Sequence, residues 1–259
     1  MMNRSSSAGV VSGTLLCAGA CFGAWNAGVQ TGVKGDSIVY QLWIPASYSA
    51  DVKYPVVITL HGAGERGTDN NKQVTFFRLT SQFTDTAFQK ANPCIIIAPQ
   101  CPWSDQWVNV PFEQSIYEQD KVPLSPSLSL VMSLLDETRK KYSVDDARIY
   151  VTGISMGGYG TWDLITRYPK KFAAAVPVCG GADPAKAPCI AHMPLWVFHT
   201  KDDPVVPARG SEMMVRALTE AKGNPKSMWH DKGGHDAWIW AYEEKTGVRE
   251  WLFSKKLGI

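Results

Sequence analysis

A serine flanked by glycines, with aspartates and histidines further along the chain, supplies the residue types needed for nucleophilic chemistry. Ser155 is the centre of the sequence Gly-Ile-Ser-Met-Gly at residues 153–157. A neutral serine hydroxyl is a weak nucleophile, so it needs a positioned base, and the base needs a third group to orient it. In one widespread arrangement the order along the chain is serine, acid, histidine. The other candidates should therefore follow Ser155.

The base is expected at His235. Of the five histidines, four follow the serine: His192, His199, His230 and His235. His199 ends one predicted strand and His230 lies within another, so both suit the core. His192 lies in a loop and has no evident partner. His235 follows two consecutive glycines after the last predicted strand, which is where the base of such a site belongs.

The acid is expected on the loop at residues 199–207, which also follows a predicted strand. Asp203 is the first choice and Asp202 is the alternative. The chosen carboxylate would hold the histidine in the correct tautomer and stabilise its cation. Asp183, after the preceding predicted strand, is a third candidate, although it could equally form an ordinary Asx turn.

Two backbone N–H groups are expected to stabilise a developing oxyanion. The Met156 N–H lies at the start of the helix that follows the serine, where the helix dipole is positive. The second donor should come from the loop after an early strand, which places it at Ala63. His61 is expected to brace this loop. No Cys-x-x-Cys pattern or His/Cys cluster predicts a metal, and the chemistry requires no cofactor.

Short apolar runs alternate with helical patterns along the chain. Continuous β-branched runs suit strands buried on both faces of a parallel sheet, whereas an alternating run suits an antiparallel edge strand. The sequence thus predicts a mostly parallel α/β sheet with helices on both faces. The alternating run is 38–44; the other predicted strands are 55–60, 94–98, 148–152, 173–178 and 195–199, followed by a last strand that contains His230. The predicted helices are 127–142, 157–168, 208–222 and 246–255.

Long connections follow the second and third strong strands, at residues 62–93 and 100–125. Long loops at the carboxyl ends of strands commonly form the walls of a ligand cleft. Trp103 and Trp107, together with Glu65, are the candidate substrate contacts. With Phe112 and Tyr117, the two tryptophans could hold an aromatic acyl group such as feruloyl or stack on a sugar; equally, the four aromatics could form a small core beneath their loop.

Three motifs resemble one group of esterases: residues 60–70 (LHGAGERGTDN), 153–162 (GISMGGYGTW) and 234–238 (GHDAW). They resemble the esterases often labelled "predicted peptidases", similar to the feruloyl-esterase-like, polyhydroxybutyrate-depolymerase-like and phospholipase/carboxylesterase branches of the α/β-hydrolases. The likeness runs from about residue 38 to 253. It implies the α/β-hydrolase fold, Asp203 as the acid, and Ala63 and Met156 as oxyanion positions. The sequence departs at Thr200, where the family usually has glycine, and this is expected to alter only a turn.

Residues and resemblance together predict a carboxylic ester hydrolase acting through an acyl-enzyme on short-chain or aryl, feruloyl-type esters. Ser155 would attack the carbonyl, and His235 would take its proton and later activate water. A serine peptidase of the same fold and an acyltransferase remain alternatives, although oligopeptidases of this fold often carry a large extra domain that does not fit in this chain. The complete set of Ser155, Asp203 and His235 disfavours an inactive binding protein.

The bulk properties suit one catalytic domain at residues 31–259, preceded by a leader at residues 1–30. A formal net charge of +2 in 259 residues, without a long basic run, argues against a nucleic-acid partner. An apolar run at residues 8–22 that contains Ala18-Gly19-Ala20 predicts a signal peptide, cleaved near Ala20, and a secreted or periplasmic protein. The run is too short and polar to span a membrane, and a simple leader is the alternative. Cys21 would allow a lipoprotein, but Ala18 stands where a lipobox normally has leucine.

Four of the six cysteines lie outside the predicted leader, and Cys17 and Cys21 lie within it. Cys94 and Cys101 flank a predicted strand, which would separate them by roughly 20 Å. That distance is too long for a disulfide. Cys179 and Cys189 border a loop rich in glycine and proline, and could either pair or remain free thiols.

Overall fold

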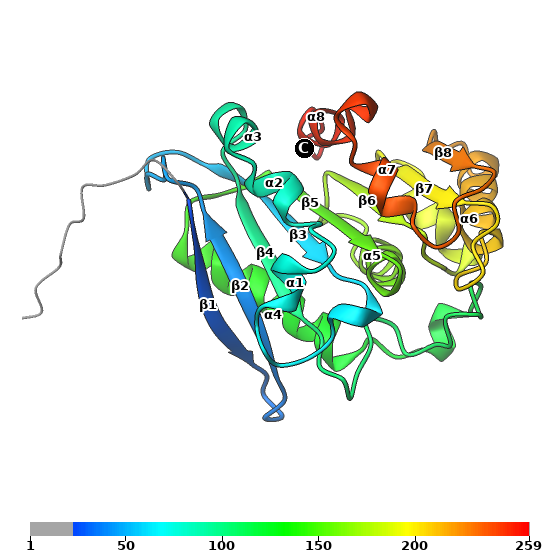
Figure 1. Ribbon diagram of the computed structural model, residues 1–259, viewed down its shortest axis with the longest axis horizontal. Helices are drawn as coiled ribbons and strands as arrows, with labels where there is room; N and C mark the ends of the chain where they lie inside the picture. The colour runs from blue at the N-terminus through cyan, green and yellow to red at the C-terminus, as the bar shows by residue number, and fades with distance from the viewer. Residues whose placement is uncertain (1–22, 259) are drawn as a thin grey trace, which may run out of the picture.

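The computed structural model describes residues 23–258. The predicted signal peptide, with its cleavage site near Ala20, lies outside these residues. One sheet of eight strands has the order β1-β2-β4-β3-β5-β6-β7-β8 (Figure 1). Strand β2 pairs antiparallel with both of its neighbours, β1 and β4. All other neighbouring strands, from β4 across the sheet to β8, pair in parallel. The bounds are β1 Ala24–Thr31, β2 Ser37–Ile44, β3 Tyr54–Leu60, β4 Ile95–Gln100, β5 Val144–Ile154, β6 Ala174–Val178, β7 Trp196–Thr200 and β8 Lys226–His230.

Helices pack on both faces of the sheet, which confirms the predicted fold class (Figure 1). The α-helices are α1 Lys72–Thr75, α2 Ser81–Thr84, α3 Thr86–Ala91, α4 Pro126–Lys141, α5 Met156–Arg167, α6 Arg209–Glu220, α7 Ala237–Ala241 and α8 Val248–Phe253. Short 3-10 helices are η1 Ala63–Glu65, η2 Gln119–Lys121, η3 Pro184–Ile190 and η4 Glu244–Thr246. The predicted helices at 127–142, 157–168 and 208–222 match α4, α5 and α6, and α8 is shorter than predicted.

The central strand β3 shows why its sequence is a continuous apolar run. Successive side chains of a strand point to opposite faces of the sheet. Val56 and Ile58 pack in the core shared with α4, α5 and α6, whereas Val57 packs in the core shared with α2, α3, α7 and α8. All residues of β3 are buried. A strand covered on both faces needs apolar residues at every position, as the sequence indicated.

The antiparallel end of the sheet differs from the prediction in one respect. Residues 38–44 were expected to form the edge strand, but β1 pairs outside β2 along its whole length, from Ala24 to Thr31. The predicted boundary between leader and domain, at residue 30, therefore falls inside β1. The sequence of β1 contains Gly28 and several polar residues, and most of its side chains are exposed or half-buried, so its strand signal is weak.

Within the described residues, Cys94, Cys101, Cys179 and Cys189 are all free thiols, and the first three are buried. Of the two alternatives for Cys179 and Cys189, the structure therefore shows the free thiols. Burial raises the pKa of the Cys94 and Cys101 thiols to about 12, so both remain protonated at neutral pH.

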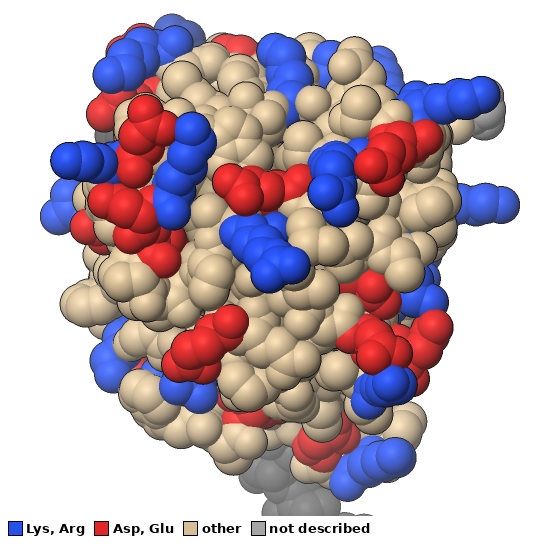
Figure 2. Space-filling view, turned by 90° about the vertical axis from the view of Figure 1, so that its right-hand side faces the viewer, with Lys and Arg blue, Asp and Glu red and all other residues tan. Residues whose placement is uncertain are grey.

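The surface beyond β8 and α6 carries acidic and basic side chains interspersed with apolar and uncharged ones (Figure 2). No single-signed stripe of charge crosses this face. Among the described residues, the helices are too short or too polar to qualify as membrane spans.

Candidate active site

Ser155 lies at the sharp turn between β5 and α5, with φ 51° and ψ −119°. Residues other than glycine rarely adopt a positive φ, so surrounding contacts must hold this conformation. The Ser155 N–H donates to the Val178 carbonyl at 3.0 Å. A Cβ added at Gly153 would lie 2.2 Å from the Gly157 oxygen, and one added at Gly157 would lie 1.9 Å from the Leu60 oxygen. Both glycines are therefore required by the close packing of this turn against the end of β3.

The structure brings Ser155, His235 and Asp203 into one hydrogen-bonded chain. The His235 Nε2 atom lies 2.7 Å from Ser155 Oγ, and its Nδ1 atom lies 2.6 Å from Asp203 Oδ2. The three residues follow β5, β8 and β7, whose carboxyl ends lie at the same edge of the sheet because the strands are parallel. With an ionised aspartate, Nδ1 donates to Asp203 and Nε2 is left to accept the serine proton.

The Asp203 carboxylate is well satisfied by hydrogen bonds. Its Oδ1 accepts the N–H groups of Val205 and Val206, both at 2.9 Å. Its Oδ2, besides contacting His235, lies 3.5 Å from His199 Nε2. Burial by itself would raise the pKa of Asp203, but these contacts with His199, His235 and the two N–H groups outweigh it and hold the pKa below its usual value. Asp203 is therefore ionised at neutral pH. Sequence reasoning had given His199 only a core position.

The other two candidate acids have different partners. Asp202 is exposed, and its Oδ1 accepts the Gly234 N–H at 2.8 Å, so it braces the turn before His235. Asp183 caps η3 and accepts the Gln119 N–H at 2.8 Å, which matches the turn role considered for it. Neither carboxylate is hydrogen-bonded to His235 in the described structure.

Ala63 and Met156 are the first residues of η1 and α5. The N–H group of a first helical residue has no partner within its own helix, and this holds for both residues. The loop around Ala63 is fixed from two sides. Glu65 Oε2 accepts the Gly62 N–H at 2.9 Å, and Arg66 Nε donates to the Ala63 carbonyl at 3.1 Å.

His61 and Glu65 lie buried beneath this loop. His61 Nε2 accepts the Cys101 N–H at 2.9 Å, and its Nδ1 donates to the Gly62 carbonyl at 2.6 Å. Burial lowers the pKa of His61 to about 4, so it is a neutral brace, as predicted. Burial raises the pKa of Glu65 to about 7. Because Glu65 exposes no surface, its position does not fit the predicted contact with substrate.

The aromatic residues of the second long connection are divided between core and surface. Trp107 is fully buried, and its Nε1 donates to the His61 carbonyl at 2.9 Å. Tyr117 is also buried, and Phe112 is half-buried against Tyr159. These three residues therefore form a small core beneath the loop, which is one of the two predicted alternatives. Because Trp107 exposes no surface, its position does not fit the predicted contact with substrate. Trp103 is 60% exposed, with the Arg66 guanidinium 5.0 Å from its ring centroid.

Two aromatic residues near the site, Phe77 and Trp238, were not singled out in the sequence. The Trp238 ring meets the His235 ring edge-on at a centroid distance of 5.2 Å, and Phe77 meets Trp238 in the same way at 5.2 Å. Trp238 lies in the motif GHDAW, three residues after the histidine and at the start of α7, and its place in this motif was the available signal. Phe77 had none, because it reaches the site only through the folding of a long loop.

Cys179 Sγ, Asp203 and His235 place one potential ligand atom each within 4.8 Å of one another. Burial raises the pKa of the Cys179 thiol well above its usual value, so the sulfur is protonated, whereas a metal requires a thiolate. The histidine and aspartate are also hydrogen-bonded to each other. This arrangement is better explained as packing beneath the site than as a metal centre.

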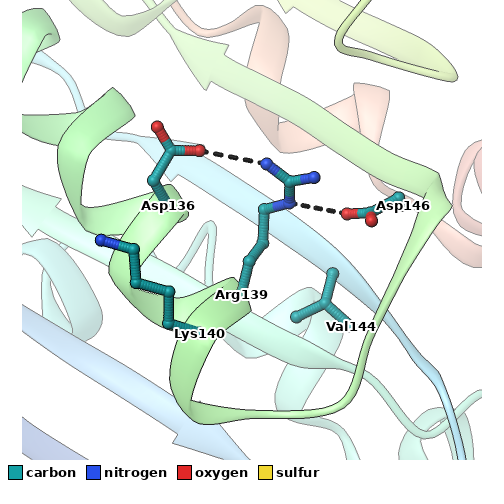
Figure 3. A pocket seen from close by; sticks show the side chains of 5 residues that line it. All are labelled: Asp136, Arg139, Lys140, Val144 and Asp146. Carbon is teal, nitrogen blue, oxygen red and sulfur yellow. Dashed lines mark hydrogen bonds and ion pairs between the residues drawn. The ribbon is translucent and has the colours of Figure 1, made fainter.

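A separate hollow lies at the beginning of β5, where Arg139 is paired with Asp136 at 3.2 Å and with Asp146 at 2.6 Å (Figure 3). Val144, the first residue of β5, lines it, whereas Ser155 follows the last residue of the same strand. The hollow therefore lies at the opposite end of the strand from the serine. Its partly exposed ion pairs suit a solvated surface.

The sheet topology, the strained serine turn and the later acid and histidine loops define an α/β hydrolase. Residues 33–248 match the Esterase family, described as "Putative esterase". The chain belongs to this family, and the match covers most of the predicted catalytic domain.

Individual relatives agree with this assignment. The chain is similar to a thermostable esterase of known structure, with a TM-score of 0.82 and 38% identity over 90% of this chain and 63% of that one. It is 32% identical over 80 residues, 29% of its length, to the bifunctional acetylxylan esterase/xylanase XynS20E of Neocallimastix patriciarum. It is 37% identical over 51 residues, 20% of its length, to poly(3-hydroxyalkanoate) depolymerase C of Paucimonas lemoignei. The matched parts span only 11% and 12% of those two proteins.

Proposed function

We propose that this protein hydrolyses carboxylic esters through an acyl-enzyme formed on Ser155. The observation that carries the proposal is the continuous chain from Ser155 Oγ to His235 at 2.7 Å and from His235 to Asp203 at 2.6 Å. His235 takes the serine proton as Oγ attacks the carbonyl carbon, and returns it to the departing alcohol oxygen. A water activated by the same nitrogen then cleaves the acyl-serine bond.

The oxyanion formed in each step is assigned to the N–H groups of Ala63 and Met156. Both begin helical segments beside Ser155, and neither N–H has a partner within its own helix. Fixed backbone donors of this kind commonly contribute a factor of about 10² to 10³ each to the rate. The hydrogen bond between Glu65 and Gly62 supports the proposal, because it holds this loop in place before substrate arrives.

Short-chain and aryl esters, including feruloyl-type esters, are the proposed substrates. The relatives named above include an acetylxylan esterase and a poly(3-hydroxyalkanoate) depolymerase, and both names point to carboxylic ester bonds. A peptidase and an acyltransferase use the same triad, so substrate panels must separate them. We would compare nitrophenyl acyl esters, methyl ferulate and acetylated xylan with chromogenic peptides. Faster hydrolysis of the peptides would favour the peptidase.

The Ser155→Ala variant provides the direct test. We expect nitrophenyl acetate hydrolysis to fall by roughly 10⁵-fold or more, to the assay background, because the nucleophile is removed. A fluorophosphonate probe should label Ser155 in the wild-type protein, as located by peptide mass spectrometry. Undiminished hydrolysis by the variant, or a label on another residue, would rule the assignment out.

Export is a separate proposal that rests on the sequence around Ala18-Gly19-Ala20. Cleavage near Ala20 would leave the whole of β1 in the mature protein, since this strand begins at Ala24. Expression in a bacterial host, followed by N-terminal sequencing of the periplasmic or secreted protein, tests the proposal. Retention of residues 1–20 in the cytoplasmic fraction would contradict it, and a lipid-modified Cys21 would indicate a lipoprotein.

A further inference from the structure

Three large apolar side chains are exposed on segments that carry or cover the proposed site. Phe76 is 61% exposed on the loop that covers the Ala63 segment, and Ile239 is 63% exposed on α7, four residues after His235. Val205 is also exposed, two residues after Asp203. Exposed apolar side chains that lie together commonly mark a binding surface. The exposed apolar side chains on these segments are therefore candidates for contact with an apolar part of the substrate.

Phe77 and Trp238 connect two parts of the site. A Cβ built at Gly62 or Gly64 would lie 3.7 or 3.6 Å from Phe77 Cε2, so the phenyl ring is in van der Waals range of the loop that carries Ala63. On its other side Phe77 meets Trp238 edge-on. Trp238 in turn meets the His235 ring edge-on. The two rings thus form a wall that runs from the oxyanion loop to the histidine.

The position of Phe77 is fixed by the backbone as well as by the rings. Its N–H lies 3.4 Å from Glu65 Oε1, while the other oxygen of the same carboxyl group accepts the Gly62 N–H. One buried side chain thereby ties the aromatic wall to the oxyanion loop. The neighbouring Phe76 packs edge-on against Phe77 at a centroid distance of 4.7 Å and extends the wall into solvent. A wall held in this way is preorganised for a ligand.

The chemistry of the tetrahedral intermediate indicates which part of an ester this wall would meet. The attacked carbon carries the serine oxygen, the oxyanion, the alcohol oxygen and the acyl carbon. The oxyanion faces the Ala63 loop, and the alcohol oxygen must face His235, which protonates it as it leaves. A wall between the Ala63 loop and His235 therefore flanks the alcohol group, while the acyl chain points away from both.

We infer that Phe76, Phe77 and Trp238 form a binding wall for an apolar alcohol group of the ester, a specificity that rests on the proposed ester hydrolysis. All three members of the wall are aromatic, and none of them carries a charge. It would favour esters of aryl or arylalkyl alcohols over those of small alcohols with the same acyl group. Packing of an added ring on such a wall should be worth at least a tenfold preference.

Two pairs of substrates separate the alcohol and acyl sides. Ethyl acetate and benzyl acetate differ only in the alcohol, whereas ethyl acetate and ethyl 3-phenylpropanoate differ only in the acyl group. For Phe77→Ala we expect the ratio of kcat/KM for benzyl acetate to that for ethyl acetate to fall about tenfold. Phe76→Ala should lower it less, and because this side chain is exposed its removal should not disturb folding. The acyl-side ratio should stay constant in both variants.

The control variant is Trp25→Leu. Trp25 is also half-buried, and its ring meets that of Trp43 edge-on at a centroid distance of 5.4 Å. It lies on β1, however, at the far edge of the sheet from the proposed site. Both ratios should remain unchanged in this variant. A selective change in the acyl-side ratio of Phe77→Ala, or no change in either ratio, would overturn the assignment of the wall to the alcohol. Absence of ester hydrolysis by the wild-type protein would instead refute the proposed function, so the two failures are distinguishable.

Discussion

At the scale of single residues, two adjacent aspartates have different tasks. Asp203 is buried and bonded to His235, whereas Asp202 is exposed and holds the turn at Gly234. In Asp203→Asn the amide would favour the wrong histidine tautomer, so we expect kcat for nitrophenyl acetate to fall by roughly 10⁴-fold. Asp202→Asn retains an acceptor oxygen and should lower kcat by only a few-fold. Steady-state kinetics of both variants check this, and a larger loss in Asp202→Asn would reverse the assignment.

Glu65 should make stability depend on pH. Its pKa rises from 4.5 to about 7 in the folded protein because of burial. The folded state then binds more protons between these values, so this contribution is complete below about pH 4.5 and is lost as pH rises through 7. At about 1.4 kcal/mol per pKa unit, the loss amounts to roughly 3 kcal/mol.

The matched comparison is Glu65→Gln, which keeps an acceptor for the Gly62 N–H but cannot ionise. Urea unfolding at pH 5, 6, 7 and 8 should show the wild-type protein losing free energy of unfolding relative to the variant across this range. A difference between the two proteins that stays constant with pH would show that Glu65 does not titrate there.

The sequence singled out three residues, Ser155, Asp203 and His235, that the structure brings into one hydrogen-bonded chain. Their convergence was predictable because their residue types, their order along the chain and their placement after strands all fit one arrangement. The burial of Trp107 and Glu65 was not predicted, because it depends on how a long loop folds and local sequence does not encode that. The same reason hid Phe77, whose contacts cross from one loop to another.

At the scale of elements, the serine turn depends on how closely α5 approaches the end of β3. A Cβ at Gly157 would meet the Leu60 carbonyl at 1.9 Å, and the clash is with backbone rather than with a flexible side chain. We expect Gly157→Ala to lower the free energy of unfolding by roughly 3 kcal/mol, and to impair catalysis by displacing Ser155.

Gly62→Ala is a suitable control for stability, because its added Cβ would meet neighbours only at 3.7 Å or more. Chemical denaturation should leave this variant close to the wild-type protein. Equal free energies of unfolding for Gly157→Ala and the wild-type protein would mean that α5 can shift away from the end of β3 without loss of stability. In that case the glycine spacing would reflect catalysis rather than packing.

The strands of the parallel region were predictable because burial on both faces leaves a continuous apolar sequence, as in β3. The antiparallel edge was not, because β1 has one exposed face and an internal Gly28 that weakens its pattern. The short helices α1, α2 and α3 were also missed. Each is too short to show a helical period in sequence, and tertiary contacts hold them in place.

At the scale of the whole molecule, the position of β1 makes the start of the folded domain testable. Removing residues 1–22 leaves the ladder between β1 and β2 intact, whereas removing residues 1–30 deletes nearly all of β1 and the contact between Trp25 and Trp43. We expect the longer deletion to lower Tm by roughly 5 °C or more relative to the shorter one. It would also expose an unpaired edge on β2, which should promote self-association. Scanning calorimetry and sedimentation of the two truncated proteins measure both effects. Identical melting would place β1 outside the cooperative unit, and the domain would then begin near residue 31, as the sequence pattern alone suggested.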